Sequence, residues 1–256
     1  MRLKTRADNI LNAIRPILSM QQKKEGIDAM FTFKEDTIET TVVDVAHVCM
    51  MRVWTDMHAS LKEGGTQEYT IEGEKEVYAI DTLRLARALK SIGTDIVTLY
   101  TEGEWLYAET DTMKASMSLV DTSRMHKPQI PRVTFIGYFD TSITLLKKRF
   151  KQLGIVSDTI QVLYDNGRIT YKAKDEFNGS MEYFEYVPCI SKNDVSARSK
   201  FPHNYLTRAV TNMFPTAESG YKVKVSIGND APICMEYTRG NTDILYMLAP
   251  RVDDRW

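Results

Sequence analysis

The sequence has few cysteines and no long hydrophobic run. Its three cysteines, Cys49, Cys189 and Cys234, are odd in number and lie in apolar, strand-like segments. This favours reduced, buried thiols over a disulfide framework or a zinc site. The longest apolar stretch, VVDVAHVCMMRVW, is interrupted by charged residues, whereas a membrane span needs about 20 mostly apolar residues. The first ten residues lack a signal-peptide core, so we expect an intracellular protein without membrane contact.

The common catalytic motifs are also missing. The sequence contains no GxxxxGK[ST] loop, HExxH, GxSxG or CxxC, which argues against nucleotide hydrolysis, zinc proteolysis and the common acyl-transfer reactions. A metal-dependent nuclease needs clustered carboxylates, and the candidates fall in turns, strand ends and loops: Asp36, Asp44, Asp158, Asp165 and Asp175. We therefore expect no enzyme, cofactor or metal.

What the sequence does contain is mostly period-two alternation, interrupted by four helical segments. Runs such as DIVTLYTEGEWLYAET and TIQVLYDNGRITYKAK are typical of strands, and DNG at 165–167 predicts a tight hairpin. The helices are predicted at about 8–21, 81–92, 140–153 and 203–213, with Asp8, Asp81 and Asp140 as N-caps.

These elements form a repeat. The first and third helices are each followed by a glycine, a strand, a polar turn and a second strand; the second and fourth each lead into further hairpins. The sequence thus predicts two copies of one α+β unit, at residues 1–118 and 133–256. Residues 119–132 carry two prolines without periodicity and are predicted to form a connector.

Each predicted helix is apolar on one side and cationic on the other. Spacings of three and four residues place the cations on one arc and the apolar residues on the opposite arc. The cations concerned are Arg15, Arg84, Arg87, Lys90, Lys147, Lys148, Lys151 and Arg208.

This arrangement is notable because the whole chain is nearly neutral, with 33 Lys+Arg against 34 Asp+Glu. Four basic faces on one surface would form a positive track, for which duplex DNA is a natural partner. Since no base-reading motif is present, we expect sequence-independent contacts to phosphate.

Several segments together resemble the sliding clamps of the proliferating cell nuclear antigen (PCNA) type, in particular the archaeal branch. They are DVAHV (44–48), GIVSDTI (154–160), APICMEY (231–237) and LYMLAPRVDD (245–254), and the likeness extends over the whole chain. The resemblance implies two similar half-domains with strands outside and four helices lining one face. It also implies a trimeric ring around DNA that acts as a processivity factor.

The resemblance further implies two contact surfaces. Partner proteins would insert a short peptide at a site formed by Val43, His47, Val48, Gln129, Ile130, Pro131, Pro232, Met247, Ala249, Pro250 and Arg251. Subunits would pair through Ala115 and Met117 of one copy and Met181 and Tyr183 of the next. The implied partners are DNA polymerase, a clamp loader, nuclease and ligase.

Three features depart from the family pattern. Pro16 lies inside the first predicted helix, the connector is basic, and Met247 stands where an aromatic residue is common. Alternative functions are a checkpoint-type or heterotrimeric clamp subunit, or a viral processivity factor. The implied location is the cytoplasm, with the nucleoid, in an archaeon, or the nucleus in a eukaryote.

Overall fold

The protein forms two compact units, each with its own helices and sheets. The computed structural model describes residues 1–20, 27–63, 65–177, 179–187, 196–212 and 222–251. The first unit comprises Met1–Asp44, Met51–Gln129 and Thr238–Ile244; the second comprises Val45–Met50, Ile130–Tyr237 and Leu245–Trp256. The units thus divide between residues 129 and 130, within the expected connector, and each also takes a short segment from the other half of the chain.

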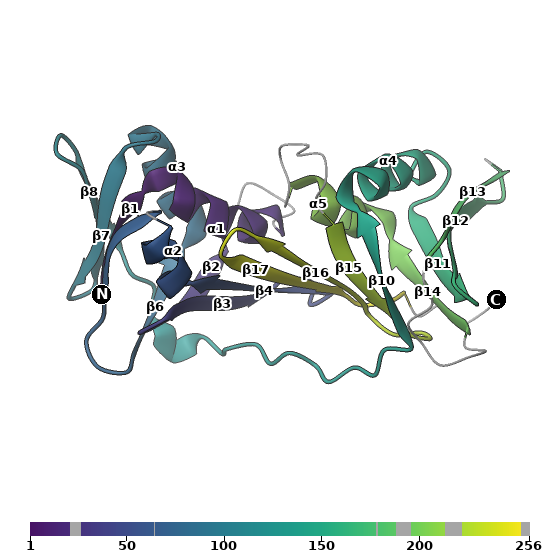
Figure 1. Ribbon diagram of the computed structural model, residues 1–256, viewed down its shortest axis with the longest axis horizontal. Helices are drawn as coiled ribbons and strands as arrows, with labels where there is room; N and C mark the ends of the chain where they lie inside the picture. Colours follow the sequence, from purple (N-terminus) through teal and green to yellow (C-terminus); the bar gives the residue numbers. More distant parts are fainter. Residues whose placement is uncertain (21–26, 64, 178, 188–195, 213–221, 252–256) are drawn as a thin grey trace. The chain divides into compact units, whose positions relative to one another are not determined.

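The first unit contains three helices among antiparallel strands. Its elements are β1 Arg2–Arg6, α1 Ala7–Ser19, β2 Asp28–Lys34, β3 Thr37–Val43, β4 Cys49–Asp56, α2 Met57–Lys62, β5 Thr66–Thr70, β6 Lys75–Asp81, α3 Thr82–Ile92, β7 Ile96–Glu102, β8 Trp105–Glu109, β9 Lys114–Ser118 and the 3-10 helix η1 Thr122–Arg124. One sheet has the strand order β5-β1-β7-β8-β9, and the other contains β4-β3-β2-β6. Helices α1 and α3 pack side by side (Figure 1).

The second unit repeats this plan with two helices. Its elements are β10 Gly137–Ser142, α4 Ile143–Leu153, β11 Thr159–Asp165, β12 Arg168–Asp175, β13 Gly179–Tyr186, β14 Ser196–Pro202, α5 His203–Asn212, β15 Lys222–Ile227, β16 Ile233–Arg239 and β17 Thr242–Leu248. The sheets have the orders β13-β12-β11-β14 and β10-β15-β16-β17, and α4 packs against α5.

The sheet orders confirm the predicted repeat. When the strands of each unit are numbered by their place along the chain, both units have the same strand order in their sheets. The order β1-β7-β8-β9 corresponds to β10-β15-β16-β17, and the order β4-β3-β2-β6 corresponds to β13-β12-β11-β14. The first unit adds α2 and β5. In the described part of the chain, β9 and β13 each have a neighbouring strand on one side only.

Helix starts agree with the sequence in one case and differ in two. Asp81 caps α3 as predicted, since its carboxylate accepts hydrogen bonds from the backbone N–H groups of Leu83 (2.9 Å) and Arg84 (3.0 Å). The predictions for Asp8 and Asp140 were wrong. Asp8 lies within the first turn of α1 and accepts a hydrogen bond from the Arg6 side chain, and Asp140 is still part of β10. Pairing with β15 extends that strand to Ser142 and delays the helix.

The sequence analysis missed one helix, α2, and Pro16 does not interrupt α1. Asp56 caps the short α2 by accepting a hydrogen bond from the Ala59 N–H at 2.9 Å. Pro16 is buried inside α1, which continues to Ser19. A proline normally disrupts a helix interior; here only three helical residues follow it, so the helix is near its end when the backbone hydrogen bond is lost.

Each core is formed by the apolar side of a helix pair packed on strands. In α3, Leu85 and Leu89 are buried, and in α4 the buried side chains are Ile143, Leu146, Phe150 and Leu153. Burying a side chain of this size stabilises the fold by about 1.5–3 kcal/mol. The DNG hairpin between β11 and β12 is confirmed, with positive φ at Asn166 (45°) and Gly167 (80°).

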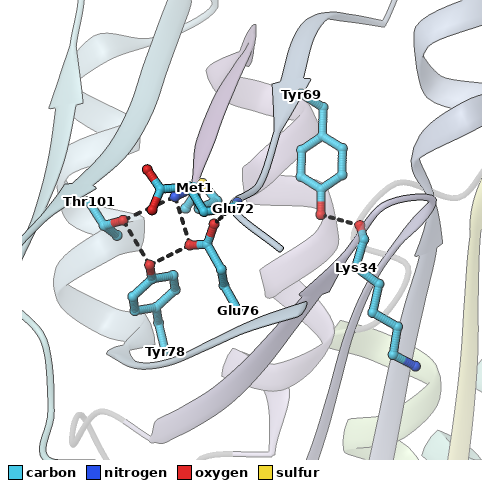
Figure 2. A network of polar contacts seen from close by, with 7 residues as sticks. All are labelled: Met1, Lys34, Tyr69, Glu72, Glu76, Tyr78 and Thr101. Atoms are coloured by element: carbon cyan, nitrogen blue, oxygen red, sulfur yellow. Dashed lines mark hydrogen bonds and ion pairs between the residues drawn. The ribbon is translucent and has the colours of Figure 1, made fainter. Parts of the chain in front are cut away.

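A polar network connects the N-terminal residue, Met1, with strands β6 and β7 of the first unit (Figure 2). The Met1 ammonium donates to the Glu76 carboxylate at 2.7 Å and to the Thr101 hydroxyl at 3.3 Å. The Tyr78 hydroxyl also donates to Glu76. Burial would raise the pKa of Glu76, but the hydrogen bonds from Met1 and Tyr78 outweigh it and lower that pKa. The network therefore holds a charged pair at the junction of β6 and β7.

The cysteine prediction is confirmed for two residues. Cys49 and Cys234 are free and buried, while Cys189 lies outside the described residues. Burial raises the pKa of the Cys234 thiol to about 12, so that thiol is protonated at neutral pH. Among the helices that the structure describes, none is long and apolar enough to cross a bilayer.

Candidate functional site

Helix α3 presents its cations to solvent. Arg84, Arg87 and Lys90 are all exposed, opposite the buried Leu85 and Leu89. Arg84 also pairs with the Asp81 carboxylate at 3.2 Å. The predicted division of this helix into an apolar and a cationic side is therefore confirmed, and its outer side can contact an anion without rearrangement.

Helix α4 divides its four cations between solvent and the sheet. Lys148 and Lys151 are exposed, while Lys147 is half-buried and burial lowers its pKa. Arg149 turns inward, where its guanidinium lies 2.9 Å from the Glu185 carboxylate of β13; these two side chains are only 13% and 17% exposed. Its guanidinium also lies over the Tyr171 ring, 5.6 Å from the centroid. The helix thus offers two fully accessible cations and uses a third to attach itself to β13.

The other two predicted helices, α1 and α5, each carry one cation, and both of these cations are half-buried. Arg15 of α1 donates to the Asn12 side chain at 3.1 Å. Arg208 of α5 lies over the Tyr205 ring, 4.8 Å from its centroid. Neither arginine is as accessible as the cations of α3.

A pocket of about 400 Å³ lies in the second unit beside the connector. Its lining residues are Ile130, Pro131, Arg132, Val133, Thr134, Phe135, Cys234, Glu236, Leu245 and Met247. Three of them, Ile130, Pro131 and Met247, belong to the peptide site that the resemblance implies. The other lining residues were not predicted. Cys234 and Glu236 lie roughly 100 residues from the connector in sequence, so no local pattern indicates that they line the same pocket.

The remaining expected peptide-site residues are divided between the units: Val43 and Gln129 belong to the first, and His47, Val48, Pro232, Ala249, Pro250 and Arg251 to the second. The Ala249 N–H donates to the Val48 carbonyl at 2.9 Å. His47 is exposed with a positive φ of 54°. Pro232 and Pro250 are half-buried, Gln129 of the connector is exposed, and Val43 is half-buried in β3 of the first unit.

Arg251 has partners of its own. Its guanidinium lies 3.3 Å from the Asp158 carboxylate, and it also hydrogen-bonds to the Thr159 hydroxyl. The hydrogen bond from Thr159, together with Arg251, lowers the pKa of Asp158. The side chain is thereby held at the start of β11, while its backbone N–H donates to the Lys200 carbonyl at 2.7 Å.

The connector is attached to the first unit by a buried carboxylate. Glu39 of β3 is 8% exposed and pairs with Lys34 (3.1 Å), Arg52 (3.1 Å) and Lys127 of the connector (3.0 Å). Burial alone would raise the pKa of Glu39, but the hydrogen bonds from Lys127, Lys34 and Arg52 outweigh it and lower the pKa to about 2. The carboxylate therefore stays ionised at neutral pH and holds the connector.

The expected subunit-contact residues lie on β9 and β13, each of which is the last strand at one end of its sheet. On β9, Met117 is buried and Ala115 half-buried; on β13, Met181 and Tyr183 are half-buried. The alternation places Met181, Tyr183 and Glu185 on the side facing the core, opposite the buried Ala173, Tyr171 and Ile169 of β12.

The chain is similar over most of its length to curated archaeal proteins. It is 27% identical over 260 residues to the DNA polymerase sliding clamp of Thermoplasma acidophilum, covering 94% of this chain and 99% of the relative. Identity to the sliding clamp of Thermoplasma volcanium is 25% over 257 residues, with the same coverage. With that of Methanococcus maripaludis it is 21% over 235 residues, covering 87% and 89%. No protein-family model matches the sequence.

Solved structures share the fold. PCNA of A. fulgidus, solved with the C-terminal region of FEN-1, superimposes with a TM-score of 0.82 at 22% identity over 99% of both chains. PCNA of Thermococcus kodakaraensis gives 0.78 at 18% identity, covering 98% of this chain and 99% of the other. These likenesses define the two-unit α+β fold of the DNA clamps. The chain thus shares the fold of these clamps and is similar over most of its length to curated proteins named DNA polymerase sliding clamp.

Proposed function

We propose that this protein is a DNA sliding clamp, a ring that encircles duplex DNA and tethers replication and repair enzymes as a processivity factor. The observation that carries the proposal is the duplicated unit, which occurs in a chain that matches curated sliding clamps over 94% of its length. Such a protein holds its partners on DNA without itself catalysing a reaction, so we assign it no enzymatic activity.

The DNA contact is assigned to the helix pairs. Arg84, Arg87 and Lys90 on α3 and Lys148 and Lys151 on α4 are the most exposed cations on these elements. Arg15, Lys147 and Arg208 are half-buried and take secondary positions. Contacts to phosphate alone carry no sequence information, which suits a ring that must slide.

Ring closure is assigned to β9 and β13. In the described part of the chain, β9 and β13 each end a sheet and have a neighbouring strand on one side only. Pairing β9 of one copy with β13 of another would satisfy the free side of both strands. A free strand side favours pairing with another chain, and a head-to-tail contact of this kind closes into a ring when the rotation allows it. Ala115, Met117, Met181 and Tyr183 would meet there.

The pocket beside the connector is assigned to partner peptides. Ile130, Pro131 and Met247 provide apolar walls, and a space of about 400 Å³ can hold one or two large side chains. Val43, His47, Val48, Gln129, Pro232, Ala249, Pro250 and Arg251 are proposed to extend the site. Polymerase, clamp loader, nuclease and ligase are the expected partners, acting on DNA in an archaeal cytoplasm or a eukaryotic nucleus.

Topological retention on DNA tests the proposal. A linear duplex is fixed to beads at one end, the protein is added, and the other end is then blocked by a bulky protein. Washing at about 0.5 M salt screens the exposed charges. A closed ring stays on the duplex until a restriction enzyme cuts it. Loss in the wash, whether or not the end is blocked, would show ordinary electrostatic binding and overturn the clamp assignment.

Two further measurements separate the alternatives. Light scattering over a dilution series should give a mass near three times 29.3 kDa. A persistent monomer would favour a heterotrimeric, checkpoint-type or viral clamp subunit. Lys148→Ala with Lys151→Ala should make the salt dependence of DNA binding shallower by roughly two units of slope. The matched control, Lys75→Ala with Lys174→Ala, removes two exposed lysines from strands and should leave it unchanged.

A further inference from the structure

The four-stranded sheet of the second unit, β13-β12-β11-β14, has one covered face and one open face. Helices α4 and α5 lie against β12, β13 and β14 (Figure 1). The side chains of β12 that point towards the helices are buried, namely Ile169, Tyr171 and Ala173. Successive side chains of a strand point to opposite faces of its sheet. The residues between these three, such as Arg168 and Lys174, therefore belong to the open face.

The open face is cationic although the whole chain is nearly neutral. The register of the strands places one row of side chains from each strand on it. In the described part of the sheet, its cations are Arg168, Lys172, Lys174, Arg198 and Lys200, and its acids are Asp165 and Glu182. Glu182 already pairs with Lys172 at 3.5 Å. Five cations against two carboxylates leave three positive charges, which favours an anionic partner with several charges.

Two aromatic side chains of β13 stand on the same face. Phe184 is 53% exposed and Tyr186 is 76% exposed, and they pair with Thr170 and Arg168 of β12. The Arg168 guanidinium lies over the Phe184 ring, 4.4 Å from its centroid. Tyr186 has no ring contact among the described residues. Large apolar side chains that are left in water beside one another indicate a binding surface.

These two rings are distinct from the side chains expected at the subunit contact. Met181 and Tyr183 point to the covered face, because they alternate with Phe184 and Tyr186 along β13. Pairing along the edge of β13 uses backbone N–H and C=O groups. The cations of β12 lie one strand further from that edge. The open face can therefore receive another partner while β13 is paired with a second copy of the chain.

We propose that the open face binds single-stranded nucleic acid, with bases stacked on Phe184 and Tyr186 and phosphates held by the cations of β12. Exposed aromatic rings among cations suit sequence-independent binding of single strands, because every base has a π-face. Arg168 is the cross-strand partner of Tyr186, so a cation and a ring lie about one strand spacing, or 4.8 Å, apart. One nucleotide can then contact both.

The rings decide between single strands and other anionic partners. In a duplex the bases stack on one another and are not free to stack on the protein. An acidic peptide would pair with the cations but leave both rings without a stacking partner. The proposal goes beyond the duplex contact assigned to the helices, because α4 and α5 lie on the covered side of this sheet.

The test measures the anisotropy of two fluorescent 12-mers added to the full-length protein at about 50 mM salt. One is oligothymidylate, and the other is an abasic deoxyribose-phosphate chain with the same number of phosphates. Oligothymidylate should bind roughly tenfold more tightly, because stacking of one base on an aromatic side chain is worth about that factor or more. Equal affinities, or no binding of either chain, would overturn the proposal.

Ring variants locate the stacking. Phe184→Ser with Tyr186→Ser should weaken oligothymidylate binding roughly tenfold and leave binding of the abasic chain unchanged. The matched control, Trp105→Ser with Tyr138→Ser, removes two other exposed aromatic side chains and should alter neither affinity. An equal loss in both variants would contradict the assignment to this face.

Charge variants separate this face from the helices. Lys172→Gln with Lys174→Gln should make the salt dependence of oligothymidylate binding shallower by about 1.4 units of slope, because each phosphate contact of a single strand contributes about 0.7. If Lys148→Ala with Lys151→Ala on α4 removes that binding instead, the oligonucleotide occupies the helices and the proposal is wrong. Displacement by a Glu-rich 12-mer at equal concentration would assign the face to acidic proteins. Retention of the protein on blocked duplex DNA is measured separately, so the clamp function and this inference can fail independently.

Discussion

The contact between α4 and α5 yields a sharp prediction about Gly154. A Cβ added at Gly154 would lie 2.0 Å from Nε2 and 2.1 Å from Cε1 of His203, where ordinary contacts need about 3.5 Å. The backbone itself would accept alanine, since the φ of Gly154 is −68°. The glycine is therefore required for close approach of the two helices, and Gly154→Ala must displace the His203 ring by roughly 1.5 Å.

The displacement has a cost because the ring is held. Nε2 lies 2.9 Å from the Phe150 carbonyl oxygen and 2.8 Å from the Thr207 hydroxyl. The carbonyl can only accept, so Nε2 carries the proton. This single N–H is shared between the carbonyl and the hydroxyl, so its loss costs about 1 kcal/mol, and forcing the ring away from its rotamer adds about 0.5–1.5 kcal/mol. Replacing glycine stabilises by about 0.4–1 kcal/mol through the unfolded chain, so we expect a net loss of about 1–2 kcal/mol.

A double-mutant cycle measured by urea denaturation isolates this effect. All four proteins are compared at one concentration, because assembly links stability to concentration. In the His203→Ala background the obstacle is absent, so Gly154→Ala should be neutral or stabilising by up to about 1 kcal/mol. The difference between the two backgrounds gives a coupling energy of about 1–3 kcal/mol. An equal penalty in both backgrounds would refute the argument, because the clash would then lie elsewhere.

Three further predictions concern charges. Asp81→Ala should lower stability by about 1 kcal/mol, measured by thermal unfolding, through loss of the α3 cap; an unchanged Tm would contradict it. Arg149→Ala should cost at least about 2 kcal/mol in urea unfolding, because the largely buried Glu185 carboxylate then loses its cationic partner and keeps only neutral donors, the hydroxyls of Thr141 and Tyr171. The matched variant Lys148→Ala in the same helix should cost almost nothing, and equal losses would disprove this difference. The pKa of Glu39 falls from 4.5 to about 2 on folding, so its contribution is complete above about pH 4.5. It is lost as the pH falls towards 2 and amounts to at most about 3 kcal/mol. The stability gap between wild type and Glu39→Gln should therefore narrow across this range, and a constant gap from pH 7 to 2.5 would contradict it.

Much of the architecture could be predicted from local patterns. Helical spacing separated Arg84, Arg87 and Lys90 from the buried side of α3, and the DNG turn predicted the β11–β12 hairpin. These features depend on residues within one element, so periodicity and turn chemistry suffice to reveal them. The repeat followed in the same way, because the same succession of helices and hairpins recurs in each half.

Other features depended on partners far away in sequence. Asp140 looked like a helix cap until pairing with β15 extended β10 through it. Arg149 was not among the predicted outward cations, but no local pattern indicated its ion-pair partner, because Glu185 is on β13. The pocket combines connector residues with Cys234 and Met247. Glu39 of β3 pairs with Lys34 of β2, Arg52 of β4 and Lys127 of the connector.

The sequence alone therefore determined the four longer helices, the buried side of each and the repetition of the unit, but it missed the short α2. Only the tertiary structure decided which cations stay exposed, which strands keep a free side and where an apolar pocket opens. The physical reason is that amphipathic periodicity is encoded within a few turns of chain. A buried ion pair, a sheet order and a pocket instead arise from long-range contacts, whose partners no local pattern specifies.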